Sequence, residues 1–123
     1  MSFVLDTTVL IDVLRGESSA STWLISLDDQ PSCSEVTRVE VVRGLLSHER
    51  SSAERLFAGL NWVPVNESIA RYAGDFGRRF RSSYGSIGTN DLIVAATAID
   101  QGATVATSNL KHFPMFKGLK RPY

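Results

Sequence analysis

Three acidic residues stand among apolar neighbours, where soluble proteins seldom place a charge. Asp6 interrupts an apolar run over residues 3–11, Glu40 lies on the apolar side of a helical pattern, and Asp91 opens an almost wholly apolar helix. Taking a carboxylate out of water costs free energy unless a partner compensates, so each position needs an explanation. Acids of this kind are candidates for a site that binds a cation.

Each acid taken alone has an ordinary structural explanation. Asp6 could cap the first helix, and Asp91 could cap its own helix or complement its positive end. Glu40 could pair with Arg38 or Arg43. The three together favour a functional site, because the crossovers of a parallel sheet can bring the ends of the first and fourth strands side by side and gather all three acids in one cleft.

Three carboxylates in one cleft would raise one another's pKa, since each charge disfavours ionisation of the others. A divalent cation removes this conflict. Hard oxygen ligands without His or Cys among them select Mg²⁺ or Mn²⁺ over Zn²⁺. Such an ion can activate a water molecule for in-line attack and offset charge that builds on a phosphate, so the pattern favours hydrolysis of a phosphodiester.

Other polar side chains are weaker candidates. Asp12 faces away from the apolar side of its helix and is expected to be a solvated surface acid. His48 and His112 have no partner at ligand spacing, so surface or loop positions are expected for both. Cys33 lacks neighbours at zinc spacing and is expected to be buried in a strand.

Short apolar runs alternate with helical patterns along the chain, which predicts an α/β fold with a parallel sheet and crossover helices. Strands are expected over residues 2–5, 31–34, 62–65 and 104–107, with a last edge strand over 119–122. Helices are expected over residues 7–15, 18–27, 35–47, 51–60, 67–81 and 91–101, and a loop over 82–88.

The 123 residues have the size of one domain, so residues 1–123 are expected to fold as a single unit. No apolar run reaches membrane-spanning length and no leader pattern precedes the first strand, so neither a membrane nor export is expected. The single cysteine suits a reducing cytoplasm. Thirteen basic and thirteen acidic residues give no net charge, which by itself does not indicate a nucleic-acid binder.

Four sequence blocks occur in the order found in PIN domains. They are FVLDTTVLID at the start, TRVEVVRGLL around Glu40, IGTNDLIVAATAIDQG around Asp91 and TSNLKHFPMF near the end. Together they span nearly the whole chain, which most closely resembles the VapC-like toxin branch of this family. The resemblance implies a three-layer α/β fold in which helices flank a parallel sheet of about five strands in the order 3-2-1-4-5. It also implies an endoribonuclease that depends on Mg²⁺, with Mn²⁺ as the alternative ion.

The resemblance also implies roles for individual residues. By position, Asp6, Glu40 and Asp91 correspond to the acidic triad: the two aspartates would be the firmest metal ligands, and Glu40 would complete the site and help to position water. Asn109 stands where some members carry a fourth acid, and its neutral oxygen leaves the number of metal ions open. Thr8 stands where many relatives have Asn and is expected to orient Asp6 through a hydroxyl hydrogen bond.

The implied partners are an RNA substrate, a second copy of the chain in a homodimer, and a cognate VapB-like antitoxin. The antitoxin's C-terminal segment would cover the cleft and present an arginine to the carboxylates. Exposed basic residues, which alone would indicate solvated surface, become candidates for holding the RNA backbone. These candidates are Arg78, Arg79 and Lys111.

Two rival functions remain open at this stage. An aspartyl-phosphate phosphatase of the haloacid-dehalogenase type would use Asp6 as the nucleophile after the first strand, although Thr8 stands where that family has a second acid. A partner-binding PIN module without catalysis would use the acids only to bind a basic peptide. A trapped acyl-phosphate would support the first, and metal-independent binding without nuclease activity would support the second.

Overall fold

Four short parallel strands form one sheet in residues 1–81 and 87–123, the part of the chain that the computed structural model describes. The strands are β1 (Phe3–Leu5), β2 (Ser32–Ser34), β3 (Asn61–Val63) and β4 (Thr104–Ala106). Their order in the sheet is β3-β2-β1-β4, so the first strand is central and lies between the second and the fourth. This agrees with the predicted order for the first four strands.

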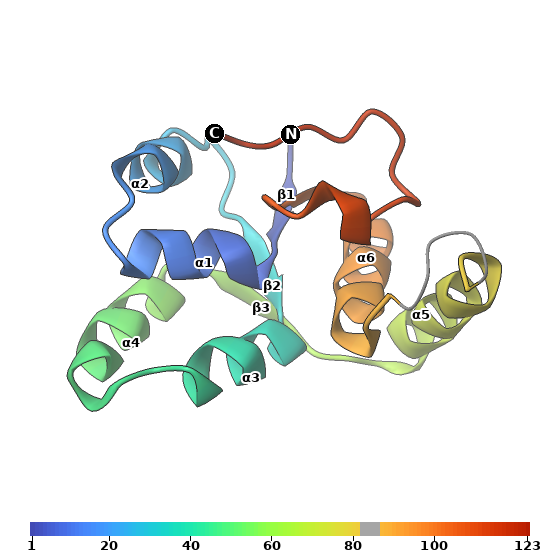
Figure 1. Cartoon of the computed structure of the whole chain (residues 1–123), viewed down its shortest axis with the longest axis horizontal. Coiled ribbons are helices and arrows are strands. Elements are labelled where there is room, and N and C mark those ends of the chain that lie inside the picture. The colour runs from blue at the N-terminus through green and yellow to red at the C-terminus, as the bar shows by residue number, and fades with distance from the viewer. Residues whose placement is uncertain (82–86) are drawn as a thin grey trace.

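Helices fill the connection between each strand and the next (Figure 1). The helices are α1 (Thr7–Leu14), α2 (Ser18–Ile25), α3 (Glu35–Arg43), α4 (Arg50–Ala58), α5 (Glu67–Arg79) and α6 (Thr89–Gln101), with short 3-10 turns η1 (Ser47–Glu49) and η2 (Leu110–His112). The predicted helices are confirmed apart from their ends: α3 stops at Arg43 because Gly44 follows it. Among the described helices, none has the length and apolar character needed to cross a membrane.

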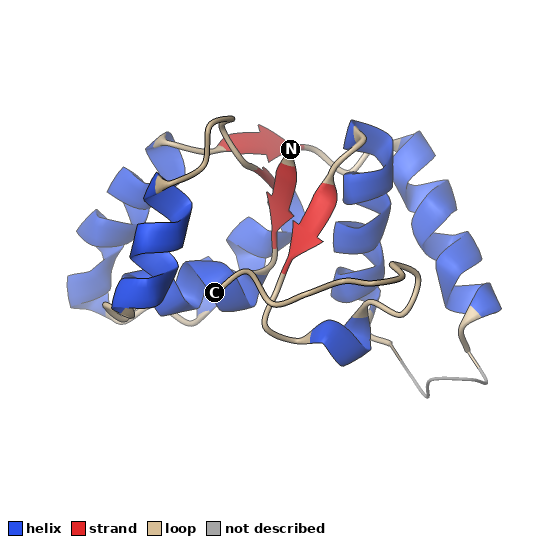
Figure 2. Ribbon diagram, turned by 90° about the horizontal axis from the view of Figure 1, so that it is seen from above, coloured by secondary structure: helices blue, strands red, loops and turns tan. Residues whose placement is uncertain are grey.

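The core is divided by the sheet into two apolar clusters. Val4 of β1 belongs to the cluster formed with α5 and α6, whereas Leu5 belongs to the cluster formed with α1, α3 and α4. Successive strand residues point to opposite faces, so this alternation requires helices on both sides of the sheet. Figure 2 shows the strands between two groups of helices, which confirms the three-layer arrangement.

The pairing of β1 with β4 determines which side chains meet at the end of the sheet. Val4 pairs with Val105 and Leu5 with Ala106, and the amide of Asp6 donates to the Ala106 carbonyl at 2.9 Å. Asp6 therefore leaves the sheet beside Thr107. The predicted juxtaposition of the first and fourth strand ends is confirmed.

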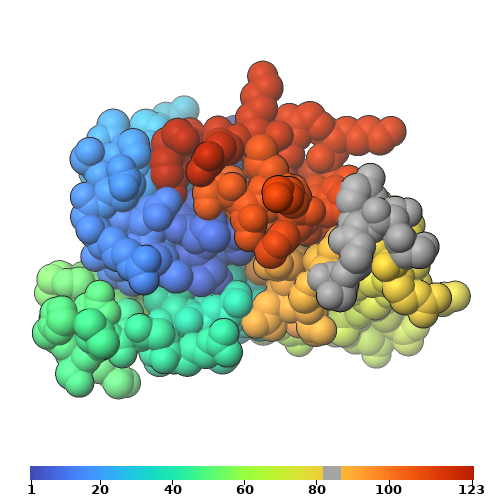
Figure 3. Space-filling model, in the orientation of Figure 1, coloured from blue at the N-terminus to red at the C-terminus, as the bar shows by residue number. Residues whose placement is uncertain are grey.

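The fifth strand expected over residues 119–122 is wrong, since no strand forms there. The segment instead crosses towards α2, and the Tyr123 hydroxyl donates to Oδ2 of Asp12 at 2.6 Å. The Tyr123 ring also packs against Trp23, with 6.1 Å between ring centroids. Pro122 has no amide hydrogen to offer a strand neighbour. Figure 3 shows the C-terminal residues, in red, along the upper edge of the molecule, next to the blue N-terminal part. Asp12 is therefore a hydrogen-bond acceptor and not simply a solvated acid.

Two further expectations concern Cys33 and the loop before α6. Cys33 is fully buried in β2, as predicted, and burial raises the pKa of its thiol to about 12. It takes no part in the acidic cluster. The loop expected over residues 82–88 falls mostly on residues 82–86, which lie outside the described part of the chain.

Candidate active site

Asp6 is the most deeply buried acid of the cluster, with 3% of the residue exposed. It follows β1 directly, and its Oδ2 accepts hydrogen bonds from Thr107 Oγ1 at 2.7 Å and from Thr8 Oγ1 at 3.2 Å. The hydrogen bond expected from Thr8 is therefore present. Asp6 occupies the N-cap position of α1, yet its side chain makes no capping hydrogen bond, so capping does not explain its burial.

The pKa of Asp6 is raised above its ordinary value, chiefly because burial disfavours the charged form. Hydrogen bonds from Thr107, the Thr7 backbone and Thr8 oppose this effect without cancelling it. The nearby charge of Glu40 raises the pKa slightly further. The carboxylate is thus held firmly in place but lacks full compensation for its charge.

Asp91 lies in the first turn of α6, and its side chain is 19% exposed. Its Oδ2 is 2.7 Å from Nδ1 of His112. Burial is the largest cause of its raised pKa, and the charge of Asp6 is the next, while His112 acts in the opposite direction. Asp6 and Asp91 therefore lie within electrostatic range of each other, although they are 85 residues apart in the sequence.

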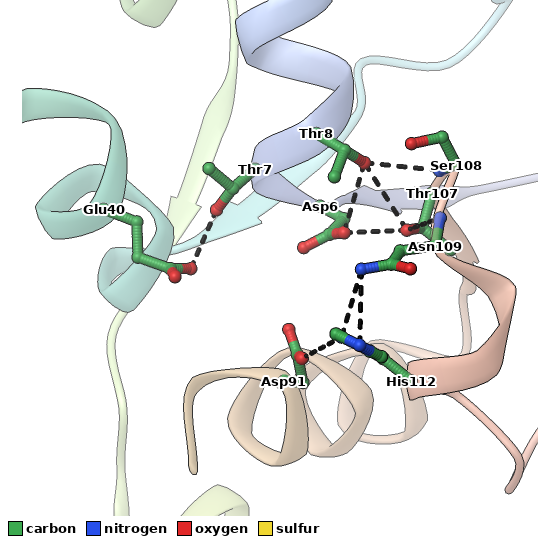
Figure 4. A network of polar contacts seen from close by, with 9 residues as sticks. All are labelled: Asp6, Thr7, Thr8, Glu40, Asp91, Thr107, Ser108, Asn109 and His112. Carbon is green, nitrogen blue, oxygen red and sulfur yellow. Dashed lines mark hydrogen bonds and ion pairs between the residues drawn. The ribbon is translucent and has the colours of Figure 1, made fainter. Parts of the chain in front are cut away.

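Glu40 lies at the rim of the cluster. It projects from α3 beside the buried Thr37 and Val41, and its Oε1 accepts a hydrogen bond from Thr7 Oγ1 at 2.8 Å. Arg38, the ion-pair partner considered from the sequence, binds Glu35 instead. Figure 4 shows Glu40 turned towards Thr7. Glu40 nevertheless contributes to the raised pKa of both aspartates.

The segment after β4 connects the two aspartates. Thr107 Oγ1 accepts a hydrogen bond from the Asn109 amide at 2.9 Å while it donates to Asp6. The Asn109 side-chain nitrogen lies 3.2 Å from Nδ1 and 3.4 Å from Nε2 of His112. Asn109 therefore directs its amide nitrogen at His112, which in turn contacts Asp91.

His112 is the site residue that sequence reasoning missed. The sequence predicts a surface or loop position, and its side chain is indeed 48% exposed, but its Nδ1 lies at hydrogen-bond distance from Asp91. The two residues are 21 positions apart and belong to different elements, so spacing gives no signal of the contact. The block TSNLKHF carries a partial signal, because one short turn joins Asn109, a predicted site residue, to His112.

The donor set fits a hard divalent cation. No lysine or arginine of the described residues forms an ion pair with Asp6, Glu40 or Asp91; their partners are hydroxyl groups and the His112 ring. In the same residues no three His, Cys, Asp or Glu side chains are grouped closely enough to hold an ion between them. By donor chemistry the three carboxylates match a hard divalent cation, and an ion held by fewer than three of them would keep water ligands.

The predicted RNA-binding residues are exposed and lie outside the acidic cluster. Arg78 and Arg79 occupy the last turn of α5, and Arg79 lies over the Phe76 ring at 5.7 Å. Lys111 is in η2, directly before His112. Their exposure leaves them available to an anionic partner.

A small hollow of about 100 Å³ lies between α1 and α3 and has Glu40 in its wall. Its apolar lining includes Ile11, Leu14 and Val41. A larger hollow of about 750 Å³ lies under the C-terminal segment, beside Phe3 and Trp23, and contains none of the three acids. Of these two hollows, the smaller is the one that touches the acidic cluster, through Glu40.

The raised pKa of Asp6 predicts a pH-dependent stability. In the unfolded chain the carboxyl titrates near 3.8, whereas in the folded chain it titrates higher, so between these pH values the folded state holds more protons. The free energy of unfolding should therefore fall as the pH rises from about 4 through the raised pKa. Asp6→Asn should remove part of this decline, as measured by urea unfolding from pH 4 to 7.5 in EDTA.

Asp100→Asn is a matched control, because Asp100 is exposed on α6 and does not belong to the acidic cluster. It should follow the parent at every pH. Parallel curves for Asp6→Asn and the parent would contradict the prediction.

Comparison with known proteins relates the chain to one family. A model of the PIN domain family matches residues 3–116. The chain is 40% identical over 123 residues to Ribonuclease VapC19 of Mycobacterium tuberculosis, with 98% of both chains covered. It is 43% identical over 122 residues to Ribonuclease VapC10 of the same organism, covering 98% of this chain and 92% of the relative.

A similar solved structure is a toxin–antitoxin complex from Klebsiella pneumoniae. One of its chains superimposes with a TM-score of 0.84 at 25% identity, covering 98% of this chain and 97% of the other. The fold described above is therefore shared over nearly its whole length.

Proposed function

The chain belongs to the PIN domain family, and from this premise we propose that it is a divalent-metal-dependent endoribonuclease, the toxin of a VapBC-type toxin–antitoxin pair. The observation that carries the proposal is the pair Asp6 and Asp91, partly or fully buried at one end of the sheet without a lysine or arginine partner in the described residues. The two mycobacterial relatives are named ribonucleases, which supports the same activity here. Residues 1–123 act as a single PIN domain.

Asp6 and Asp91 are the residues that would hold Mg²⁺, or Mn²⁺ in its place, and Glu40 would complete the site. When bound, the ion supplies stabilisation of charge on the phosphodiester and a water molecule of lowered pKa. Asn109 adds no charge, and its side-chain nitrogen faces His112. The protein charge available to the site is therefore that of three carboxylates.

The chain's own side chains keep these acids in working positions. Thr107 and Thr8 hold Asp6 through Oδ2, so Oδ1 is the oxygen that would face the ion. Thr7 holds Glu40 through Oε1, which leaves Oε2 to accept a hydrogen from the attacking water. Arg78, Arg79 and Lys111, which are exposed, hold the phosphate backbone of the RNA.

The partners follow from the same family. The similar structure from Klebsiella pneumoniae is a toxin–antitoxin complex, which supports a cognate antitoxin for this chain. We place an apolar side chain of the antitoxin in the hollow between α1 and α3, with an antitoxin arginine directed at the carboxylates, of which Glu40 lines this hollow. The chain forms a homodimer and acts in the cytoplasm.

The phosphatase considered from the sequence is not proposed. The family match is to the PIN domain. Thr8, where a phosphatase would need a second acid, donates its hydroxyl hydrogen to Asp6 and so occupies an oxygen of the supposed nucleophile.

The test is RNA cleavage by the purified protein with Mg²⁺, with Mn²⁺ and with EDTA. We expect cutting with either ion and none in EDTA, with activity restored when the ion is returned in excess. Asp100→Asn, which leaves the acidic cluster intact, should cut at the parent rate. Cleavage that persists in EDTA would refute metal dependence, and no cleavage of any RNA pool would favour a partner-binding PIN module without catalysis.

A further inference from the structure

His112 contacts Asp91 but has no part in the chemistry proposed above. Its Nδ1 lies 2.7 Å from Oδ2 of Asp91. No other described side chain lies closer to that carboxylate in a hydrogen bond or ion pair. The ring comes from η2, outside the helix that carries Asp91, so the contact joins two elements. It therefore restrains Asp91 from outside α6.

The direction of this hydrogen bond follows from the chemistry of the groups. An ionised carboxylate can only accept, so His112 donates through Nδ1–H. The Asn109 side-chain nitrogen lies 3.2 Å from Nδ1 and 3.4 Å from Nε2, so it contacts the ring at nearly equal distance from both nitrogens. Asn109 therefore packs against the ring beside its contact with Asp91.

The same segment also holds Asp6. Thr107, at the start of the segment, donates to Asp6 at 2.7 Å, and the Asn109 amide donates to Thr107 at 2.9 Å. Residues 107–112 therefore contact one aspartate at each end (Figure 4). Because Phe113, the next residue, is buried in the core, the end of the segment that bears His112 is anchored.

We propose that His112 is a positioning residue of the acidic site, which fixes the Asp91 carboxylate through Oδ2 so that Oδ1 is presented to the metal ion at a set distance from Asp6. This inference rests on the proposed function, because it assumes that the aspartates bind an ion. Groups that hydrogen-bond to metal ligands orient them, and their loss typically weakens metal binding about 10- to 100-fold.

The experiment measures Mn²⁺ binding to the full chain by isothermal titration calorimetry. His112→Phe keeps a ring but removes the donor, and we expect its Mn²⁺ affinity to fall by roughly 10- to 100-fold. His112→Asn places an amide nitrogen near the position of Nδ1 and should retain most of the affinity. His48→Ala, which removes the exposed histidine of η1, should bind Mn²⁺ as the parent does.

A second measurement separates positioning from folding. The RNA-cleavage rate of His112→Phe, followed against Mn²⁺ concentration, should need more ion for half-maximal rate, while the melting temperature without metal stays near that of the parent. Parent-like Mn²⁺ affinity in His112→Phe would overturn the inference, as would equal loss in His112→Asn and His112→Phe. A parent chain that neither binds Mn²⁺ nor cuts RNA would instead overturn the proposed function, and the inference with it.

Discussion

Asp6→Asn is expected to abolish metal-dependent RNA cleavage while the protein stays folded. Asparagine has nearly the same shape and can still accept hydrogen bonds from Thr107 and Thr8, but it supplies no negative charge to the ion. A bound metal ion can stabilise the transition state by several kcal/mol. Losing about 4 kcal/mol of this stabilisation corresponds to a rate reduction on the order of 1,000-fold. The rate of cleavage at saturating Mg²⁺ measures this effect.

The stability of the same variant makes the result unambiguous. Because the pKa of Asp6 is raised in the folded chain, Asp6→Asn should be at least as stable as the parent at pH 7 without metal. Low activity therefore cannot be ascribed to unfolding. Cleavage by Asp6→Asn at the parent rate would show that Asp6 is not a ligand of the catalytic ion.

Phe113→Ala is expected to cause the largest loss of stability among single substitutions near the site. Phe113 is 1% exposed and packs in the core cluster of α5 and α6, so truncation leaves a cavity. Such substitutions cost about 3–5 kcal/mol, which lowers the melting temperature by roughly 10–20 °C in a domain of this size. Thermal unfolding followed by circular dichroism measures the change.

Phe113→Leu is the matched control, because it keeps most of the apolar volume. It should lose a smaller part of the stability, and Leu110→Ala, in the same short turn but only partly buried, should also lose less. Equal melting temperatures for Phe113→Ala and the parent would contradict the burial on which the prediction rests.

Much of the fold could be predicted from local patterns. The alternation of apolar runs with helical spacing predicts the first four strands and the helices, and Gly102 lies where α6 ends, as predicted, whereas α3 ends at Gly44, before its predicted end. The edge strand over residues 119–122 could not be judged in this way. Whether an edge segment pairs with the sheet depends on competing contacts, here those of Tyr123 with Asp12 and Trp23, which join residues about 100 positions apart.

The candidate site, like the fold, could be predicted only in part from the sequence. Acids at apolar positions are visible in the sequence, and the pairing of β1 with β4 accounts for the approach of Asp6 to the segment after Ala106. The contacts that orient each acid are not visible, because they depend on side-chain rotamers and on long-range packing. Thr7 with Glu40 and His112 with Asp91 are both of this kind, and the catalytic roles of the acids stay predictions.

The central position of β1 has a consequence for protein synthesis. Asp6 is made early, yet the threonine that holds it follows 101 residues later. At a translation rate of about 5–20 residues per second, roughly 5–20 s separate the two on the ribosome. During that interval the nascent chain has the first strand without its neighbour β4 and lacks Thr107 and His112. The acidic cluster can therefore take its folded arrangement only after residues 107–112 have been made.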